Sequence, residues 1–407
     1  MAPGNRRTVK LLALLLAFAL TAFAQLQVDP GIASEIAKIK AIDNHAHPVL
    51  PAPGDTEYDA LPVEHMEPYT EPIRMRGGAP LPASHLFDAP DKREGYPSWV
   101  LDQLGIETML ANRVALGPGI APPRFLWVPF EDALLFPLDN RVLAINPDRK
   151  AFFEDEDRLL ARYLKECGYT KPPATLGEYL TKVVDPTLDR HKRGGAVAIK
   201  FEAAYLRSLD FDDVSRADAD AAYAHKQPYK KLQDFLFRHI AAEAGRLGMA
   251  VHLHVAWGPG GYFHIAGTNP LLLESVFNDP RLHQTNFVLL HGGWPFTREI
   301  TALLTKPNVY ADFSAQTLTN YPRRVAQVLR EWLEFAPDKV LFATDAYPYS
   351  DQLGWEQSGW VASDTGRQAL GLALTEMMND GELTRDRAVE IAHLVLRDNA
   401  RKLYGLK

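Results

Sequence analysis

Short apolar runs alternate with longer amphipathic segments along most of the chain. Each of eight runs ends in a polar residue or is followed by one, as buried strands do. The predicted strands are 40–45, 106–112, 124–130, 196–201, 249–254, 286–291, 308–312 and 339–344. Helical spacing of apolar positions predicts helices at 220–247, 268–278, 297–306 and 322–336, with 366–379 and 384–403 as closing helices. Alternating strands and helices indicate a parallel sheet, and eight such units predict a (β/α)₈ TIM barrel.

The chain has 407 residues, whereas a barrel of this kind needs ~250. The excess falls at 48–105, between the first two strands, and at 131–194, between the third and fourth. Ten of the fifty residues 48–97 are proline, which predicts an irregular cover. The second insertion contains two helical patterns. Both insertions follow carboxyl ends of strands, so we expect them to wall the active-site face. Contacts between subunits are the alternative.

The first 24 residues have the pattern of a secretory signal peptide. Arg6, Arg7 and Lys10 precede the apolar run 11–23, and Ala22 and Ala24 supply the small residues of a cleavage site. The run is shorter than the ~20 residues of a spanning helix, although an uncleaved anchor is the alternative. We therefore expect an exported protein, periplasmic or secreted, whose residues 25–407 form one domain.

The composition limits the classes of binding partner and of metal site that the chain can have. The formal charge of −7 argues against nucleic-acid binding and against stable membrane association after signal cleavage. A single cysteine excludes a Cys-rich zinc site, so any metal site must use nitrogen and oxygen ligands. We expect a small-molecule substrate, and a homodimer is left open.

The strongest local signal is the pair His45 and His47 at the end of the first predicted strand. Residues two apart on a strand point to the same side, so both imidazoles can share one cation at the barrel mouth. A pair of surface histidines is the alternative.

Other polar residues close later strands. Lys200, His254, His291 and Asp345 end the fourth, fifth, sixth and eighth strands. A buried lysine needs a carboxylate, a lowered pKa or a modification. His252 lies one layer deeper than His254, which favours a core role. Together these positions predict a metal site at the carboxyl ends of the strands.

This constellation resembles the amidohydrolase superfamily, and most closely its amidohydrolase-related branch (amidohydrolase family 2). The similarity runs from about Ala41 to Leu406 and includes the segments IKFEAAYLRSLDF, HLHVAWGPGG, NPLLLESVF and LLHGGWPFTREI. His45 and His47 are similar to the family's first-strand metal ligands. His254, His291 and Asp345 match its fifth-, sixth- and eighth-strand residues. Lys200 lies where some members carry a carbamylated lysine that bridges two metals.

The ligand types suit Zn²⁺, with Mn²⁺ or Fe²⁺ as alternatives. We hypothesise that His45, His47, His254 and Asp345 hold the main ion, which activates a water molecule. Asp345 orients this water and takes its proton. His291 either binds a second metal, together with carbamylated Lys200, or polarises the substrate and moves protons.

The resemblance implies a metal-dependent hydrolase that cleaves a C–N or C–O bond, with a decarboxylase as the alternative reaction. A binding protein without catalysis is a third reading. Arg207 and Tyr205 follow Lys200 and are candidates to hold a substrate carboxylate, although Arg207 could equally pair with a nearby acid. Arg113 is a weaker candidate, and Trp257 and Trp294 are candidates for an aromatic wall.

Overall fold

The computed structural model describes residues 27–52, 54–61, 95–144, 147–258, 263–349 and 353–406. The predicted signal segment and most of the first insertion, residues 62–94, lie outside the described residues.

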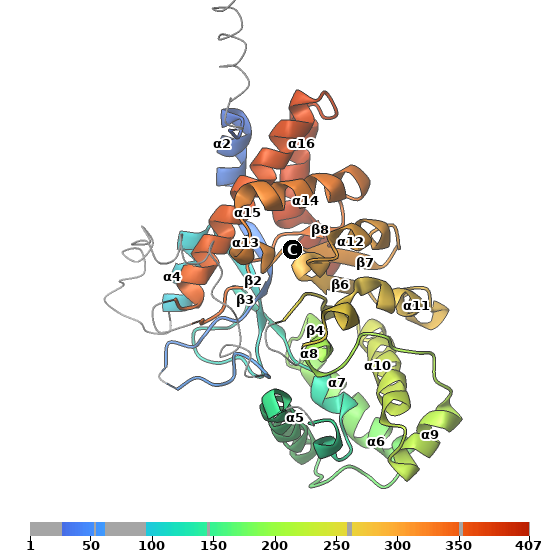
Figure 1. The fold of residues 1–407 in the computed structure, drawn as a ribbon. Helices are drawn as coiled ribbons and strands as arrows, with labels where there is room; N and C mark the ends of the chain where they lie inside the picture. The colour runs from blue at the N-terminus through green and yellow to red at the C-terminus, as the bar shows by residue number, and fades with distance from the viewer. Residues whose placement is uncertain are drawn as a thin grey trace, which may run out of the picture.

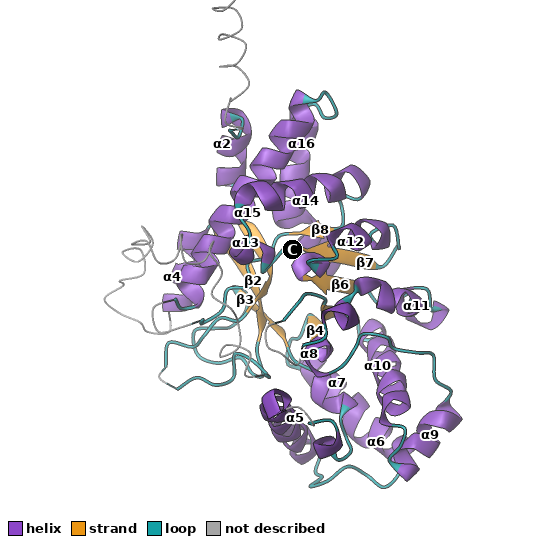
Figure 2. Cartoon of the chain, in the orientation of Figure 1, coloured by secondary structure: helices purple, strands orange, loops and turns teal. Residues whose placement is uncertain are grey.

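In the part of the chain that the structure describes, there are eight parallel strands. Strands lie at the centre of the molecule, with helices around them (Figure 2). The strands are β1 (Ala41–Ala46), β2 (Ile106–Asn112), β3 (Phe125–Val128), β4 (Ala198–Phe201), β5 (Ala250–His254), β6 (Phe287–Leu290), β7 (Val309–Asp312) and β8 (Val340–Leu341). Hydrogen bonds order them β1-β2-β3 and β4-β5-β6-β7-β8. All eight overlap the predicted strands.

Two sets of contacts close these strands into a barrel. Parallel bridges from Trp127 to Ala196 and from Phe130 to Lys200 join the edges of β3 and β4. On the other side, the segment after β8 lies against β1, where the Asp345 amide donates to the His45 carbonyl at 2.8 Å. The predicted (β/α)₈ barrel is thereby confirmed.

The barrel interior is filled by one small apolar cluster. Its buried members are Ile42, Leu110, Val128, Ala198, Ala250, Val288, Leu290, Leu341 and Ala400. Ala400 comes from the last helix, α17 (Asn399–Tyr404). The Tyr404 hydroxyl reaches the His252 Nε2 at 2.7 Å, so His252 belongs to this interior layer.

Helices surround the strands, with α14, α15 and α16 gathered on one side and α5 to α10 on the other (Figure 1). The helices of the barrel units are α8 (Ala203–Leu206), α9 (Arg216–His225), α10 (Tyr229–Arg246), α11 (Glu274–Phe277), α12 (Thr297–Leu303), α13 (Gln316–Thr319), α14 (Pro322–Phe335), α15 (Trp355–Asn379) and α16 (Arg385–His393). Short 3₁₀ turns lie at η6 (Ile265–Thr268), η7 (Pro270–Leu273), η8 (Pro280–Leu282) and η9 (His291–Gly293). The described helices include none that is both long and apolar enough to cross a membrane.

Three helix predictions need correction. The helix expected at 220–247 is two helices, because Pro228 has no amide hydrogen to continue α9 and Lys226 turns the chain at φ 62°. The segment 268–278 forms the end of η6, then η7 and α11, since Pro270 begins a new turn. The closing segment 384–403 contains a π-helical stretch, η10 (Leu394–Asp398), between α16 and α17.

Both predicted insertions contribute residues near the carboxyl ends of the strands. The described part of the first contains an irregular stretch up to Leu61 and ends with α4 (Tyr96–Leu104). The second contains η3 (Asp132–Leu135), η4 (Asn140–Val142), α5 (Pro147–Glu166), α6 (Leu176–Tyr179), the π-helical η5 (Leu180–Val184) and α7 (Asp185–Arg193). The periodicity search missed α2 (Pro30–Lys38), which precedes β1 and is capped by Asp29.

Candidate metal centre

A small cavity of about 50 Å³ lies at the carboxyl ends of the strands. Eight residues that the sequence singled out line it: His45, His47, Lys200, Tyr205, His254, Trp257, His291 and Asp345. They come from β1, β4, β5 and the segments after β1, β4, β5, β6 and β8. The barrel therefore brings together residues that are up to 300 positions apart in the chain.

Asp345 lies at the centre of the histidine group. Its Oδ1 is 3.1 Å from His45 Nε2 and 3.8 Å from His47 Nε2. Its Oδ2 is 3.7 Å from His291 Nδ1. One ligand atom from each of His45, His47 and Asp345 fits within 4.8 Å of the others. This spacing allows all three to bind one ion.

Hydrogen bonds orient the two β1 histidines. His45 Nδ1 lies 2.9 Å from the Asn112 Oδ1, and His47 Nδ1 lies 3.0 Å from the Tyr58 carbonyl oxygen. Both partners are oxygens that accept, so each Nδ1 carries the proton and each Nε2 keeps its lone pair. This is the usual arrangement of a histidine that binds metal through Nε2.

His254 offers a further ligand. Its Nε2 is buried and, like that of His45, has no hydrogen-bond partner among the described residues. Its ring lies 4.7 Å from that of His291, between centroids. An unpaired buried nitrogen is costly unless something occupies it. The donor set thus fits a metal ion on the atoms that the protein itself leaves unsatisfied.

His291 is held by a chain of buried polar groups. Its Nδ1 lies 2.9 Å from the Ser314 hydroxyl, which donates in turn to Asp312 at 2.6 Å. Because the Ser314 proton is donated to Asp312, the Ser314 oxygen accepts a hydrogen bond from His291 Nδ1–H. The Nε2 of His291 is left as the basic atom.

Burial keeps these imidazoles neutral. It lowers the pKa of His254 to about 3, with a smaller contribution from the Lys200 charge. The pKa values of His45 and His291 also lie well below the usual range, chiefly because of burial. Neutral imidazoles retain the lone pair that metal binding requires.

The backbone around the cavity is strained. His291, Ala315 and Asp345 have φ values of 61°, 53° and 55°, a region that non-glycine residues rarely adopt. All three line the cavity. The buried Asp43 fixes this backbone by accepting from the Thr344 amide at 2.9 Å. Strain of this kind persists where surrounding contacts enforce it and is concentrated at functional sites.

The sequence reading missed a group of carboxylates beside the histidines. Glu202 Oε1 lies 3.3 Å from Lys200 Nζ, which provides the partner that a buried lysine needs. Asp59, from the first insertion, also lines the cavity, and its Oδ2 lies 3.8 Å from His47 Nδ1. Asp59, Glu202 and His47 form a second group with metal-like spacing. The two carboxylates have no strand-end pattern, although the sequence places Glu202 two residues after Lys200.

Two more buried acids lie behind this pair. Asp132 Oδ2 accepts from the Glu202 amide at 2.8 Å, and Glu156 on α5 has no hydrogen-bond partner among the described residues. Burial raises the pKa of Asp59, Asp132 and Glu156 well above their usual ranges, with repulsion from neighbouring carboxylates as a further cause.

Arg207 is not brought into the cavity. Its guanidinium pairs with the buried Asp234 at 2.7 Å and lies over the Phe211 ring. It is absent from the cavity lining, so the expected role in holding a substrate carboxylate has no geometric support. Arg113 is likewise committed, because it pairs with Asp55 at 2.8 Å. Of the two tryptophans, Trp257 lines the cavity, whereas Trp294 packs against the Trp257 ring.

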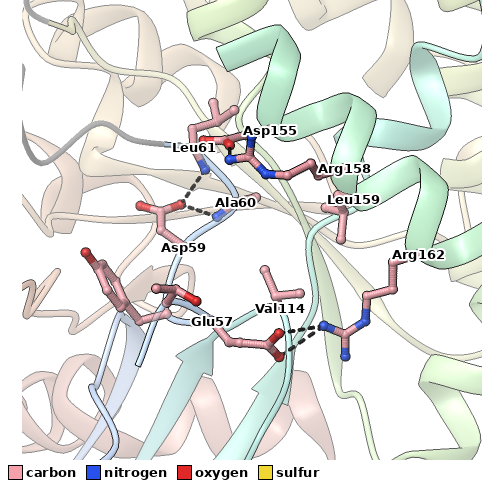
Figure 3. A pocket seen from close by; sticks show the side chains of 11 residues that line it. Glu57, Asp59, Ala60, Leu61, Val114, Asp155, Arg158, Leu159 and Arg162 are labelled. Atoms are coloured by element: carbon pink, nitrogen blue, oxygen red, sulfur yellow. Dashed lines mark hydrogen bonds and ion pairs between the residues drawn. The ribbon is translucent and has the colours of Figure 1, made fainter. Parts of the chain in front are cut away.

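A larger cavity of about 360 Å³ adjoins the first and shares Asp59 with it (Figure 3). Asp59 Oδ1 accepts from the amides of Ala60 and Leu61 at 2.7 and 3.3 Å. On the opposite side, Arg162 pairs with Glu57 at 2.8 Å. The charged groups of this outer cavity are therefore mostly paired with each other.

Comparison with known families gives a direct match. The model of the family described as amidohydrolase matches residues 164–406, which is more than half of the chain. The chain belongs to the amidohydrolase family. The matched span contains Lys200, His254, His291 and Asp345, and it begins after the two β1 histidines.

Among curated proteins, the chain is similar to Protein fluG of Emericella nidulans. The two are 28% identical over 184 residues, which is 44% of this chain and 20% of that protein. The chain thus matches about a fifth of this relative's length.

Solved structures share the fold. A protein of Lactobacillus casei described as a metal-dependent hydrolase superposes with a TM-score of 0.66 at 16% identity, covering 92% of this chain and 97% of that one. Uronate isomerase of Thermotoga maritima gives a TM-score of 0.58 at 13% identity, covering 92% and 96%. Glucuronate isomerase of Caulobacter crescentus gives 0.57 at 14% identity, covering 95% and 97%. At these identities the likeness concerns the fold alone.

Proposed function

We propose that this protein is a metal-dependent hydrolase that cleaves a C–N or C–O bond of a small substrate. One observation carries the proposal: His45, His47, His254 and Asp345 direct unsatisfied or weakly paired ligand atoms into one buried cavity. Such nitrogen and carboxylate ligands suit Zn²⁺ first, with Mn²⁺ or Fe²⁺ as alternatives. A bound divalent ion would supply Lewis acidity and lower the pKa of a water molecule toward ~7.

The protein's own residues have distinct roles in this proposal. Asp345 faces the histidines with both oxygens, and its side chain is 14% exposed, so it can accept a proton from an attacking water. His291 presents a basic Nε2, because Ser314 holds its Nδ1 proton. Its place beside His254 suits this nitrogen to accept a proton during the reaction and to pass it to the leaving group.

The chemical state of Lys200 distinguishes a site with one metal ion from a site with two. Its Nζ pairs with Glu202 at 3.3 Å, an arrangement that accounts for an unmodified lysine. With an unmodified Lys200, we expect one metal ion per chain. A carbamylated Lys200 would instead favour a second ion with His291 as an additional ligand.

The test is a screen of the zinc-loaded protein against small amides, lactones and esters in H₂¹⁸O. Hydrolysis predicts one ¹⁸O atom in the product, and Asp345→Asn should lower kcat by about 10²- to 10⁴-fold if Asp345 is the proton acceptor. Release of CO₂ without ¹⁸O in the organic product would identify a decarboxylase and contradict the proposal. Interconversion of a uronate without bond cleavage would contradict it as well.

We also propose that the protein acts after export, because residues 1–24 have the pattern of a signal peptide. N-terminal sequencing of the protein from fractionated cells should give a chain that begins at Gln25. An intact N-terminus in the cytoplasmic fraction would contradict this.

A further inference from the structure

The cavity has more negative charge than its metal ligands require. Among the described residues that line it, the carboxylates are Asp59, Glu202 and Asp345, and the sole lysine or arginine is Lys200. Asp345 belongs to the metal centre. Two carboxylates therefore face one ammonium group, and burying an unbalanced carboxylate is costly.

Asp59 and Glu202 are held in place, but each keeps one carboxyl oxygen without a hydrogen bond. Two backbone amides bind Asp59 Oδ1 and fix the side chain, which is 4% exposed. Its Oδ2 has no hydrogen-bond donor among the described residues, and neither does Glu202 Oε2. A second cationic group with N–H bonds, in addition to Lys200, would satisfy both of these oxygens.

A second metal ion fits this position poorly. The remaining candidate ligand is His47, whose Nδ1 already binds the Tyr58 carbonyl and whose Nε2 faces Asp345. The Lys200 ammonium, 3.3 Å from Glu202, would also repel a divalent ion.

A cationic nitrogen fits it better. Tyr205, Trp257, Tyr347 and Tyr349 line the same cavity, and aromatic faces attract cations that are shielded from water. The N–H groups of an ammonium can bind two carboxylates at once.

We propose that Asp59 and Glu202 form a subsite for a cationic nitrogen of the substrate, beside the metal centre. This inference rests on the proposed function, since it assigns the substrate class of the same site. The substrate then carries an amine in addition to the bond that is cleaved, with the carbonyl directed toward the histidines and the ammonium toward Asp59.

The experiment uses hydroxamates, which chelate an active-site metal, and measures binding by calorimetry at pH 7.5. The zinc-loaded protein is titrated with the ω-amino hydroxamates of β-alanine, 4-aminobutyrate and 5-aminovalerate. Each is compared with the alkyl hydroxamate of equal length. We expect one amino compound to bind about tenfold more tightly than its alkyl partner, a difference of roughly 1.4 kcal/mol.

Asp59→Asn and Glu202→Gln should each abolish this preference and leave the affinity for the alkyl hydroxamates unchanged. Unchanged alkyl binding also shows that the variants fold and hold zinc. Asp157→Asn is the matched control, because Asp157 lies on the same insertion helix as Glu156, binds Asn140 and does not line the cavity. It should keep the preference.

Three results would overturn the subsite. Equal affinity of amino and alkyl compounds at every length would exclude it while leaving the metal centre intact. A second zinc equivalent that disappears in Asp59→Asn would show that a metal occupies this position. Absence of binding by every hydroxamate would remove the metal centre, and the subsite with it.

Discussion

The mouth of the barrel has two sides that differ in chemistry and in origin. The histidine side consists of His45, His47, His254, His291 and Asp345, all on strands or within four residues of a strand end. The carboxylate side consists of Asp59, Asp132, Glu156 and Glu202, of which all but Glu202 lie in the two insertions. The barrel thus positions the atoms that suit a metal, and the insertions add buried acidic residues beside them.

The two sides also differ in how their polar atoms are satisfied. On the histidine side, partners such as Asn112 and Ser314 hold one ring nitrogen and leave the other free. On the carboxylate side, Glu156 has neither oxygen bound among the described residues. The first pattern is that of a preorganised ligand set, whereas the second leaves buried carboxyl oxygens without hydrogen-bond partners among the described residues.

Replacing one carboxylate on each side should separate them most clearly. Asp345→Asn should weaken Zn²⁺ binding by more than about 100-fold, because a ligand matters more than the outer partners, whose loss costs 10- to 100-fold. Asp59→Asn should change it by less than about threefold, since Asp59 is not a ligand in this account. Competition with a fluorescent chelator measures both. If both variants lost Zn²⁺ affinity equally, the two sides would form one binuclear site.

Loss of an orienting partner should have an intermediate effect. Ser314→Ala leaves the His291 Nδ1–H without its acceptor, and should lower kcat by about 10- to 100-fold, as expected for a group that orients a catalytic histidine. Ser314→Thr keeps the hydroxyl and should recover most of this loss. A pH profile of kcat that shifts in Ser314→Ala would distinguish orientation of His291 from a general loss of folding. An unchanged kcat and profile would remove His291 from the mechanism.

The buried histidines should make the metal-free protein sensitive to acid. Burial lowers the pKa of His252 to about 3, whereas an unfolded histidine titrates near ~6.5. Between these values the unfolded chain binds the extra proton, so this contribution to stability falls as the pH falls. Urea unfolding at pH 7.5 and 5.5 should show that His252→Asn reduces the acid-induced loss by about 1 kcal/mol.

The exposed His283 provides the control for that measurement. His283→Asn should leave the difference between the two pH values as in the parent protein. A His252→Asn variant with the same acid-induced loss as the parent would show that His252 titrates normally.

The smallest effect is expected at Arg207. Because its guanidinium is bound to Asp234 and lies outside the cavity lining, Arg207→Lys should change Zn²⁺ and hydroxamate affinity by less than about twofold. Calorimetry on the zinc-loaded variant measures this. A tenfold loss of affinity for a carboxylate-bearing ligand would instead support the anchoring role that the sequence left open.

The strand pattern was sufficient to predict the barrel and the histidine side. Buried strands have a strong hydrophobic signal, and a polar residue that ends such a run, like His291, must lie at the barrel mouth. Asp59 could not be found in this way, because it lies in a Pro-rich irregular stretch with no periodicity to place it. The two roles left open for Arg207 could not be decided for a related reason: its position after β4 does not reveal that α10 carries the buried Asp234 that pairs with it.

Predicted helix boundaries were wrong where a proline interrupted an apolar spacing that continues on both sides of it. Residues 220–247 keep an apolar spacing through Pro228, yet the proline ends one helix and begins another. The signal segment, export and oligomeric state stay predictions.

The most direct test of the account is the metal content of residues 25–407, purified without chelator and measured by mass spectrometry. We predict about one transition-metal ion per chain, lost when His45 and His47 are both replaced by alanine and retained in Asp59→Asn. A protein that takes up no metal after incubation with Zn²⁺ or Mn²⁺, or one whose double variant keeps its metal, would contradict the account.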